Sequence, residues 1–199
     1  MKELLVATGN NGKLKEIRQI LAGFVDHLYS SADFPDLPEV VEDGLSFEEN
    51  ACKKALSAVR AKGVPAIADD SGLVVDALGG KPGVFSARYA GDGASDAENN
   101  RKLLHDLEGV STNERTAYFS CVVSLCFPDG TCRIFCGTLN GSILNSPRGN
   151  EGFGYDPLFL VPEYGKTLAE LDPAIKNSIS HRGKAMDELR QFLCALRGK

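Results

Sequence analysis

The sequence predicts a mixed α/β fold built around a twisted β-sheet. Apolar runs typical of strands alternate along the chain with segments in which apolar residues recur at helical spacing. Two further apolar runs, residues 116–127 and 132–139, flank a Pro-Asp-Gly turn and predict a long β-hairpin. Strand–helix units combined with a hairpin are typical of a mixed sheet covered by helices.

The N-terminal part of the chain contains a strand, a loop and a helix. Residues 3–7 are expected to form a buried strand, residues 8–12 a loop, and residues 14–21 an amphipathic helix. A second helix is expected to begin at Ser46, because Glu49 stands three residues later in a capping-box pattern.

Two short strands are expected next, over residues 66–68 and 73–75, separated by the run Asp69-Asp70-Ser71-Gly72. The capping-box pattern returns at Ser95, ahead of a helix that extends through Leu107. The last helix is expected over residues 184–196, where apolar residues line one stripe.

Composition places the chain among ordinary globular proteins. Of its 199 residues, 43% are hydrophobic and 25% charged, and no repeat or polar linker interrupts them, so residues 1–199 are expected to form one domain. The net charge of -5 argues against non-specific binding of nucleic acid or of anionic membranes. The apolar N-terminal run is too short for a signal peptide, and a cytoplasmic location is expected.

The six cysteines do not follow the spacing of a metal site. Cys121, Cys126, Cys132 and Cys136 cluster around the hairpin turn, but no Cys-x-x-Cys pair occurs. Free cysteine behaves as a small hydrophobic residue in strands. We therefore expect structural thiols and a reducing compartment.

The first candidate site is the loop between the first strand and the first helix, which consists of Thr8, Gly9, Asn10, Asn11, Gly12 and Lys13. Small residues allow close backbone approach to an anion, the helix N-terminus offers unpaired N–H groups, and Lys13 adds a positive charge. The glycine spacing is not that of a Walker loop. The loop is interpreted as a phosphate site, with an ordinary glycine-rich turn as the alternative.

Adjacent carboxylates at Asp69 and Asp70 form the second candidate. Two carboxylates at a strand end repel each other, unless a cation or proton lies between them. Magnesium bound by one or two carboxylates plus substrate phosphates is common in phosphoryl chemistry. The acidic stretch from Glu39 to Asp43 offers a further ligand, and a solvated turn is the alternative interpretation.

Two later segments complete the set. Residues 152–157 alternate glycines with aromatic residues, which suits a stiff loop that stacks a ring on a nucleobase, although such a loop can also anchor the core. Lys176, His181, Arg182 and Lys184 supply hydrogen-bond donors for an anion or a keto oxygen, or else a solvated helix start. Together, the four segments predict a magnesium–nucleotide site.

These motifs, in this order, resemble the inosine triphosphate pyrophosphatase family of non-canonical purine nucleotide hydrolases. The matching segments are Thr8-Gly9-Asn10…Lys13, Glu42-Asp43-Gly44…Phe47…Asn50-Ala51, Asp69-Asp70-Ser71-Gly72-Leu73, Pro82-Gly83…Ser86-Ala87-Arg88-Tyr89, Phe153-Gly154-Tyr155-Asp156-Pro157 and Ser180-His181-Arg182-Gly183. They cover essentially the whole chain. The resemblance implies an elongated two-lobed α/β fold with a central substrate cleft, a Mg²⁺ requirement and a homodimer.

The resemblance also implies residue roles. Residues 8–13 would hold the triphosphate, Asp70 would be the catalytic carboxylate and a metal ligand, and Ser71 would touch substrate. Glu42 is the chosen second metal ligand, with Glu39 left open. The remaining substrate-binding residues implied are Phe153, Gly154, Tyr155, Asp156, Lys176, His181 and Arg182. Of these, Phe153 would stack on the purine, and Asp156, His181 and Arg182 would read its edge.

The implied reaction is hydrolysis of ITP, dITP and XTP between the α- and β-phosphates, giving a monophosphate and pyrophosphate. One alternative is a Maf-like nucleotide pyrophosphatase with a different base specificity. The other is a regulatory module that binds nucleotides without catalysis. The adjacent carboxylates at Asp69 and Asp70 argue against that module, because they would hinder phosphate binding alone.

Overall fold

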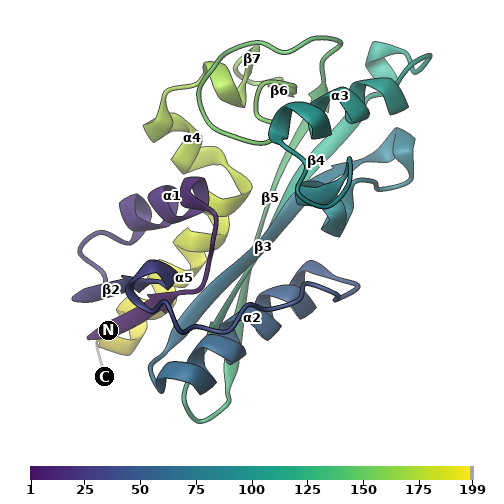
Figure 1. Cartoon of the computed structure of the whole chain (residues 1–199). Coiled ribbons are helices and arrows are strands. Elements are labelled where there is room, and N and C mark those ends of the chain that lie inside the picture. The colour runs from purple at the N-terminus through teal and green to yellow at the C-terminus, as the bar shows by residue number, and fades with distance from the viewer. Residues whose placement is uncertain (198–199) are drawn as a thin grey trace. The chain divides into compact units, whose positions relative to one another are not determined.

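A computed structural model describes residues 1–197, which form a seven-stranded mixed sheet flanked by helices (Figure 1). The strand order is β2-β1-β3-β4-β5-β6-β7. The strands are β1 (Glu3–Val6), β2 (His27–Ser30), β3 (Ala66–Val75), β4 (Thr116–Cys126), β5 (Cys132–Ile143), β6 (Phe159–Val161) and β7 (Lys166–Thr167). Strand β1 is parallel to β2 and β3, whereas β6 is antiparallel to β5 and β7. The predicted mixed α/β fold is confirmed.

Helices separate and follow these strands. They are α1 (Asn11–Leu21), α2 (Phe47–Lys62), α3 (Asp96–Asp106), α4 (Pro173–Ile179) and α5 (His181–Arg197). Helix α5 begins three residues before the predicted residue 184, and α4 was not predicted. Within residues 1–197, no helix has the length and apolar character needed to cross a membrane.

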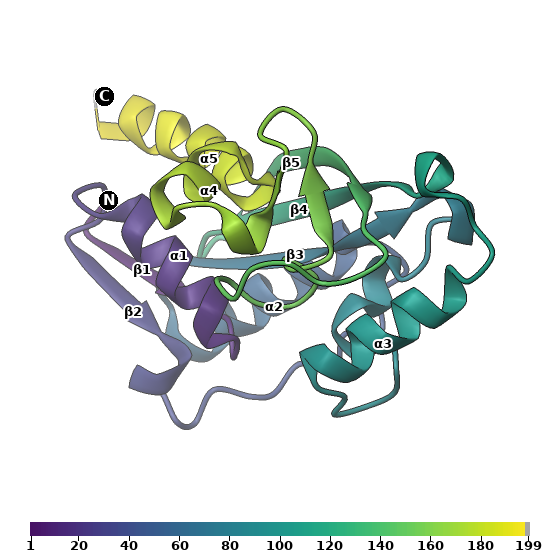
Figure 2. The ribbon, with the colours of Figure 1, turned by 90° about the horizontal axis from the view of Figure 1, so that it is seen from above.

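The chain divides into two compact units. The first unit contains residues 1–70, 121–137 and those from 182 onward. In it, α1 and α5 cover one face of the sheet and α2 covers the other (Figures 1 and 2). The alternation of β1 shows why: Leu4 and Val6 pack with α1 and α5, while Leu5 packs with α2.

The second unit contains residues 71–120 and 138–181. Its core joins the C-terminal half of β3 to α3 and to β6, through the buried side chains of Leu73, Leu103 and Phe159. The capping box predicted at Ser95 is present, because Glu98 accepts from the backbone N–H of Ser95 and donates its own N–H to the serine hydroxyl. This cap fixes the start of α3.

The cap of α2 differs from the predicted pattern. The hydroxyl of Ser46 accepts a hydrogen bond from the Glu49 N–H at 3.2 Å, as expected. The carboxylate of Glu49, however, accepts from the N–H of Leu45 at 2.7 Å. The Glu49 side chain therefore binds the backbone of Leu45, which precedes the cap residue, instead of that of Ser46. Both hydrogen bonds hold the loop before α2 against the start of the helix.

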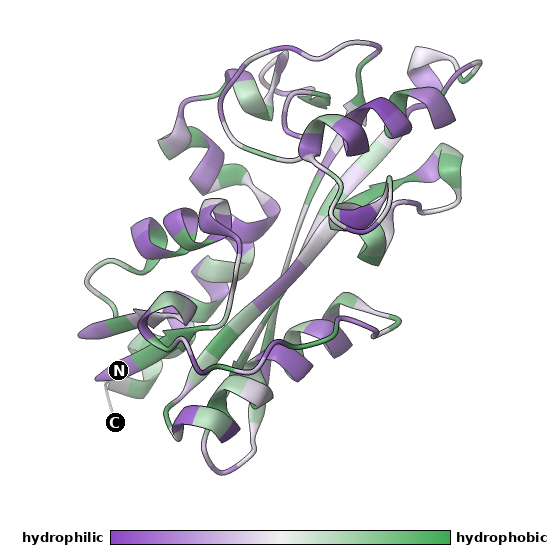
Figure 3. Cartoon of the chain, viewed as in Figure 1, coloured by the Kyte–Doolittle hydropathy of each residue, from purple (hydrophilic) through white to green (hydrophobic). Residues whose placement is uncertain are grey.

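The prediction of two short strands around Asp69 and Asp70 is wrong, because β3 is continuous from Ala66 to Val75. Figure 3 shows a hydrophilic middle between two apolar stretches of this strand. Buried polar groups are tolerated in a strand when partners satisfy them. The aspartates have such partners, which local composition did not reveal.

The prediction of thiols throughout the hairpin is also wrong, because Cys126 and Cys132 form a disulfide. The turn between them closes with hydrogen bonds from Phe127 N–H to the Thr131 carbonyl and from Gly130 N–H to the Phe127 carbonyl. It brings the two Cα atoms to 4.1 Å from each other. Metal-site spacing was therefore the wrong criterion for this pair, since a hairpin register pairs residues that lie six positions apart.

Candidate functional site

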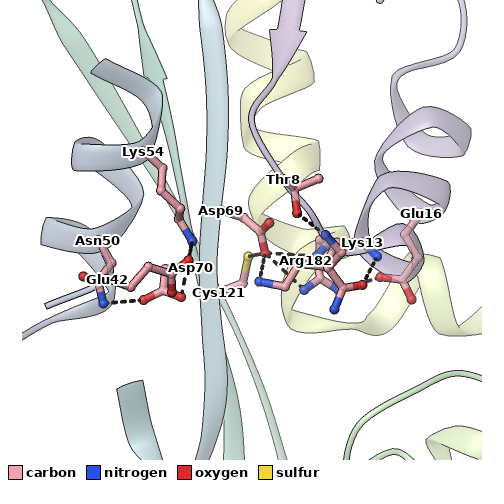
Figure 4. Close-up of polar contacts among 11 residues, drawn as sticks. Thr8, Lys13, Glu16, Glu42, Asn50, Lys54, Asp69, Asp70, Cys121 and Arg182 are labelled. Atoms are coloured by element: carbon pink, nitrogen blue, oxygen red, sulfur yellow. Dashed lines mark hydrogen bonds and ion pairs between the residues drawn. The ribbon is translucent and has the colours of Figure 1, made fainter. Parts of the chain in front are cut away.

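Strand β3 directs Asp69 and Asp70 to opposite faces of the sheet (Figure 4). Successive side chains of a strand alternate in direction, so adjacent carboxylates are separated by the backbone itself. The expectation that one cation lies between them is therefore wrong. Instead, each carboxylate has its own set of partners within the first unit.

Asp69 lies in a buried network of charges. Its Oδ2 atom is 3.0 Å from Lys13 Nζ and 3.1 Å from Arg182 Nη2. The other arm of the guanidinium, Nη1, donates to Glu16 Oε2 at 2.6 Å. Burial alone would raise the pKa of Asp69, but the charges of Lys13 and Arg182 outweigh it and hold that pKa well below its usual range. Asp69 is thus a permanently ionised anchor for two cations.

Lys13 also belongs to the candidate phosphate loop. The loop is held by its own side chains: Thr8 Oγ1 accepts from the Asn10 N–H at 3.2 Å, and Asn10 Oδ1 accepts from the Lys13 N–H at 3.0 Å. At Gly9, no atom lies within 4 Å of the place that a Cβ would take, so the loop backbone is open there. Asn11 and Gly12 form the first turn of α1, where N–H groups favour an anion.

Asp70 faces α2 on the other side of the sheet. Its Oδ2 accepts from Asn50 Nδ2 at 3.0 Å, and its Oδ1 lies 3.7 Å from Lys54 Nζ. The same ammonium donates to Glu42 Oε1 at 2.8 Å. Two carboxylates from distant segments therefore approach one cation (Figure 4).

The position of Glu42 depends on a glycine two residues later. The buried side chain of Asn50 accepts from the Gly44 N–H at 2.8 Å while it donates to Asp70. A Cβ at Gly44 would lie only 2.6 Å from Asn50 Oδ1, which no larger residue can accept without displacement. The Glu42-Asp43-Gly44 motif thus folds against α2, beside Asp70.

The pKa of Asp70 is shifted in the opposite direction from the pKa of Asp69. Burial raises the pKa of Asp70, and the charges of Lys54 and Lys13 offset this only in part, so the net pKa is raised. Burial would lower the pKa of Lys54, but Asp70, Asp69 and Glu42 together raise it, and the lysine stays charged. Asp70 is therefore a carboxylate with increased proton affinity, as a general base requires.

The carboxylates of Asp70 and Glu42 fit a hard divalent cation. Both are oxygen donors that already face the ammonium group of Lys54. Glu39, the alternative ligand, is exposed to solvent. Among residues 1–197, no group of three or more His, Cys, Asp or Glu side chains is arranged to hold a metal. The remaining ligands would be water and phosphate oxygens, which is the usual arrangement for Mg²⁺.

The aromatic-glycine loop lies in the second unit and contains a buried ion pair. Asp156 Oδ2 accepts from Lys176 Nζ at 2.7 Å and from the Phe153 N–H at 2.9 Å. The ammonium of Lys176 also lies 4.9 Å from the centre of the Phe153 ring. Gly152 is required here, since its φ is +80° and a Cβ would lie 2.1 Å from Asp156 Oδ2.

Two residues of this loop serve to fix it. The ring of Tyr155 is buried in the core, and its hydroxyl donates to the Ser86 carbonyl at 2.8 Å. The backbone of Gly154 donates to Asp96 and accepts from Asn100, both on α3. The Tyr155 side chain is therefore a core anchor, as the alternative interpretation of the loop allowed. The substrate contacts expected of Gly154 and Tyr155 stay predictions.

The predicted basic cluster is divided among different partners. Arg182 pairs with Asp69 and Glu16, whereas Lys176 pairs with Asp156. The ring of His181 stacks on Phe119 with their centres 4.7 Å apart. Base reading by these residues, and substrate contact by the half-buried Ser71, stay predictions.

No role was predicted for Asn50, Lys54 or Glu16. Asn50 and Lys54 are four residues apart on α2, a spacing that places two side chains on one helix face. That spacing, next to an acidic motif, was the available signal. Glu16 carries no comparable signal, because its partner Arg182 lies 166 positions along the chain.

The network of Asp69 predicts a pH-dependent effect on stability. Asp69→Asn should lower the free energy of unfolding by about 3–5 kcal/mol at pH 7, because it leaves buried cations without their counter-charge. Since the folded pKa of Asp69 is depressed, its contribution is fully present above the unfolded value of about 3.9 and is lost as the pH falls below that value. Urea unfolding of both proteins from pH 7 to pH 3 measures the difference. A difference that stays constant to pH 3 contradicts the assignment.

Comparison with known proteins identifies the family of the chain. A family model described as the Ham1 family matches residues 4–192. The dITP/XTP pyrophosphatase of Geobacter sulfurreducens is 59% identical over 97% of both chains, and that of Geobacillus kaustophilus is 51% identical over 95% of this chain and 93% of its own. The solved structure of a HAM1 protein from Coxiella burnetii has a TM-score of 0.89 at 43% identity, and covers 98% of this chain and 100% of its own. The resemblance inferred from the motifs is confirmed, and the chain belongs to the Ham1 family.

Proposed function

We propose that this protein hydrolyses ITP, dITP and XTP to the nucleoside monophosphate and pyrophosphate, with Mg²⁺ as the cofactor. Its family and its relatives named dITP/XTP pyrophosphatase make it a nucleoside triphosphate pyrophosphatase, a hydrolase. The observation that carries the proposal is that β3 places Asp69 and Asp70 on opposite faces of the sheet, in different electrostatic environments. Asp69 holds cations on one face, while Asp70, with a raised pKa, faces Glu42 and Lys54 on the other.

The triphosphate is assigned to the loop of residues 8–13. Its open backbone at Gly9 and the first-turn N–H groups of α1 suit phosphate oxygens. Lys13 adds a charge whose position is fixed by Asp69. The loop therefore stabilises negative charge on the departing pyrophosphate without reorganisation.

The chemical step is assigned to Asp70. A divalent cation held by Asp70 and Glu42 would neutralise the phosphate oxygens. Asp70 accepts a proton from the water that attacks the α-phosphorus, which its raised pKa favours. Asn50 keeps the carboxylate in place, and Lys54 supplies a further charge near the phosphates.

Base recognition is assigned to the second unit. Phe153 stacks on the purine, and Ser71, Asp156, Lys176 and His181 supply polar contacts to the substrate. Lys176 is a donor only, so it pairs with the C6 oxygen of hypoxanthine or xanthine and opposes the C6 amino group of adenine. The buried pair with Asp156 holds its ammonium beside the Phe153 ring.

The proposal extends to the cellular role. We infer that residues 1–199 act as one catalytic domain, as a homodimer in the cytoplasm, and remove deaminated purine nucleotides from the precursors of DNA and RNA. The match of one family model to residues 4–192 supports the single domain.

The products test the reaction. Incubation with ITP and Mg²⁺ should release pyrophosphate and IMP in equal amounts, because attack at the α-phosphorus breaks the α–β bond. Chromatography and a pyrophosphate assay without added phosphatase measure this outcome. Early orthophosphate together with IDP contradicts the proposal.

Asp70→Asn should reduce kcat by at least about 100-fold, because the variant loses a proton acceptor and a metal ligand. The melting temperature should not fall, since the raised pKa means that ionised Asp70 does not favour the folded state. Asp92→Asn, at an exposed position, is the matched control and should retain full activity. Substantial turnover by a well-folded Asp70→Asn protein would mean that another residue is the general base.

Lys176→Met should reduce the preference for ITP over ATP by about 10- to 100-fold in kcat/KM, because one donor–donor mismatch costs about 1–3 kcal/mol. Lys176→Met removes an ion-pair partner from Asp156 alone, whereas Arg182→Ala removes one from both Asp69 and Glu16 and is therefore the less direct probe. Steady-state assays with ITP, XTP, GTP and ATP give the ratios. An unchanged ITP/ATP ratio contradicts base reading by Lys176.

A further inference from the structure

Two cysteine sulfurs of the first unit contact one buried serine, and a third cysteine is bonded to one of them. The hydroxyl of Ser124, on β4, donates to Cys52 Sγ at 3.4 Å and lies 3.3 Å from Cys126 Sγ. Cys126 is joined to Cys132, and both pack with the core under α2. The sulfurs of Cys52 and Cys126 are thus no farther apart than the sum of the two distances to Ser124.

We propose that Cys52, Cys126 and Cys132 form a thiol–disulfide exchange site, in which Cys52 attacks the hairpin disulfide at Cys126. The Cys52 thiolate forms a bond to Cys126 Sγ, the Cys126–Cys132 bond breaks, and its electron pair leaves on Cys132 Sγ. Cys132 then takes up a proton in place of the one that Cys52 lost. The step conserves electrons and needs no external oxidant.

The surroundings select Cys52 as the attacking thiol. It is a free, half-buried cysteine, and the hydrogen bond that the Ser124 hydroxyl donates to its sulfur holds that sulfur on the side of α2 that faces Cys126. Cys121 belongs to the core under α1 and α5, on the opposite face of β4. Burial, with a smaller effect from Asp69, also raises the pKa of Cys121 to about 12.

The contacts of Ser124 also indicate that Cys126 is the sulfur that Cys52 attacks. Cys126 is completely buried and contacts the serine that Cys52 also contacts. Cys132 is half-buried on β5, so it is the partner that can be released toward solvent. Attack at Cys126 therefore joins α2 to β4 and frees a thiol on the neighbouring strand.

The exchange would act on the site described above, and this consequence rests on the proposed function. Cys52 lies between Asn50 and Lys54 on α2, which both contact Asp70. A Cys52–Cys126 disulfide would bring the two Sγ atoms to about 2.05 Å from each other and draw α2 toward β4. Since displacements of about 1 Å can cost about 100-fold in rate, the exchanged form is expected to be about 10- to 100-fold slower.

Peptide mapping tests the exchange without reference to activity. The full chain, Cys52→Ser and the control Cys194→Ser, at an exposed cysteine of α5, are equilibrated at pH 8 in mixtures of reduced and oxidised glutathione. After acid quenching and alkylation, cleavage before Asp129 separates Cys126 from Cys132. Fragmentation of the linked peptides then locates each bond.

Wild type and Cys194→Ser should contain both the Cys126–Cys132 and the Cys52–Cys126 bonds, whereas Cys52→Ser should contain the first alone. Absence of a Cys52–Cys126 bond at every glutathione ratio overturns the proposal, as does a bond from Cys52 to Cys132. Pyrophosphate release, measured on the same samples, should fall with the fraction of Cys52–Cys126 in wild type but not in Cys52→Ser. An unchanged rate in exchanged protein overturns the link to the site, while a lack of pyrophosphate in every sample instead counts against the proposed function.

Discussion

The alternation of side chains along β3 is the constraint on which the candidate site depends. Asp69 and Asp70 are neighbours in sequence, yet the pleat directs one toward α1 and α5 and the other toward α2. Each face then provides a different environment for the same chemical group. A turn at this position, which was the alternative interpretation of the sequence, would expose both carboxylates to water and remove that difference.

On one face, the buried carboxylate of Asp69 connects the beginnings of two helices. Lys13 lies in the first turn of α1, and Arg182 is the second residue of α5. The cost of burying these charges is offset by the hydrogen bonds of Lys13 and Arg182 to Asp69, and by Glu16, which accepts from the other arm of the guanidinium at 2.6 Å. The candidate phosphate loop between β1 and α1 is therefore attached to the sheet by a contact that persists across the physiological pH range.

On the other face, the groups are less completely compensated. Asp70 has Asn50 and a more distant Lys54 as partners, and its net pKa is raised. A carboxylate in this state is poorly stabilised by the protein alone and gains from a cation or a proton, as is common at functional sites. Cys52 lies on the same helix, so α2 carries both the support for Asp70 and the attacking thiol of the proposed exchange site.

The sequence by itself determined the fold class, the first helix, the Ser95 cap, the hairpin and the family, because each depends on local spacing or on motifs in a fixed order. It also identified Asp70, Lys13 and the loop of residues 152–157 as candidate site residues.

Only the tertiary structure decided that β3 is continuous, that Cys126 pairs with Cys132, and that Arg182 lies against Asp69, 113 positions away in the chain. Short strands such as β6 and β7 are likewise defined by pairing with their neighbours and not by their own pattern. The physical reason is the same in each case: a buried charge, a strand register or a disulfide depends on partners that folding brings together, and local composition carries no record of them.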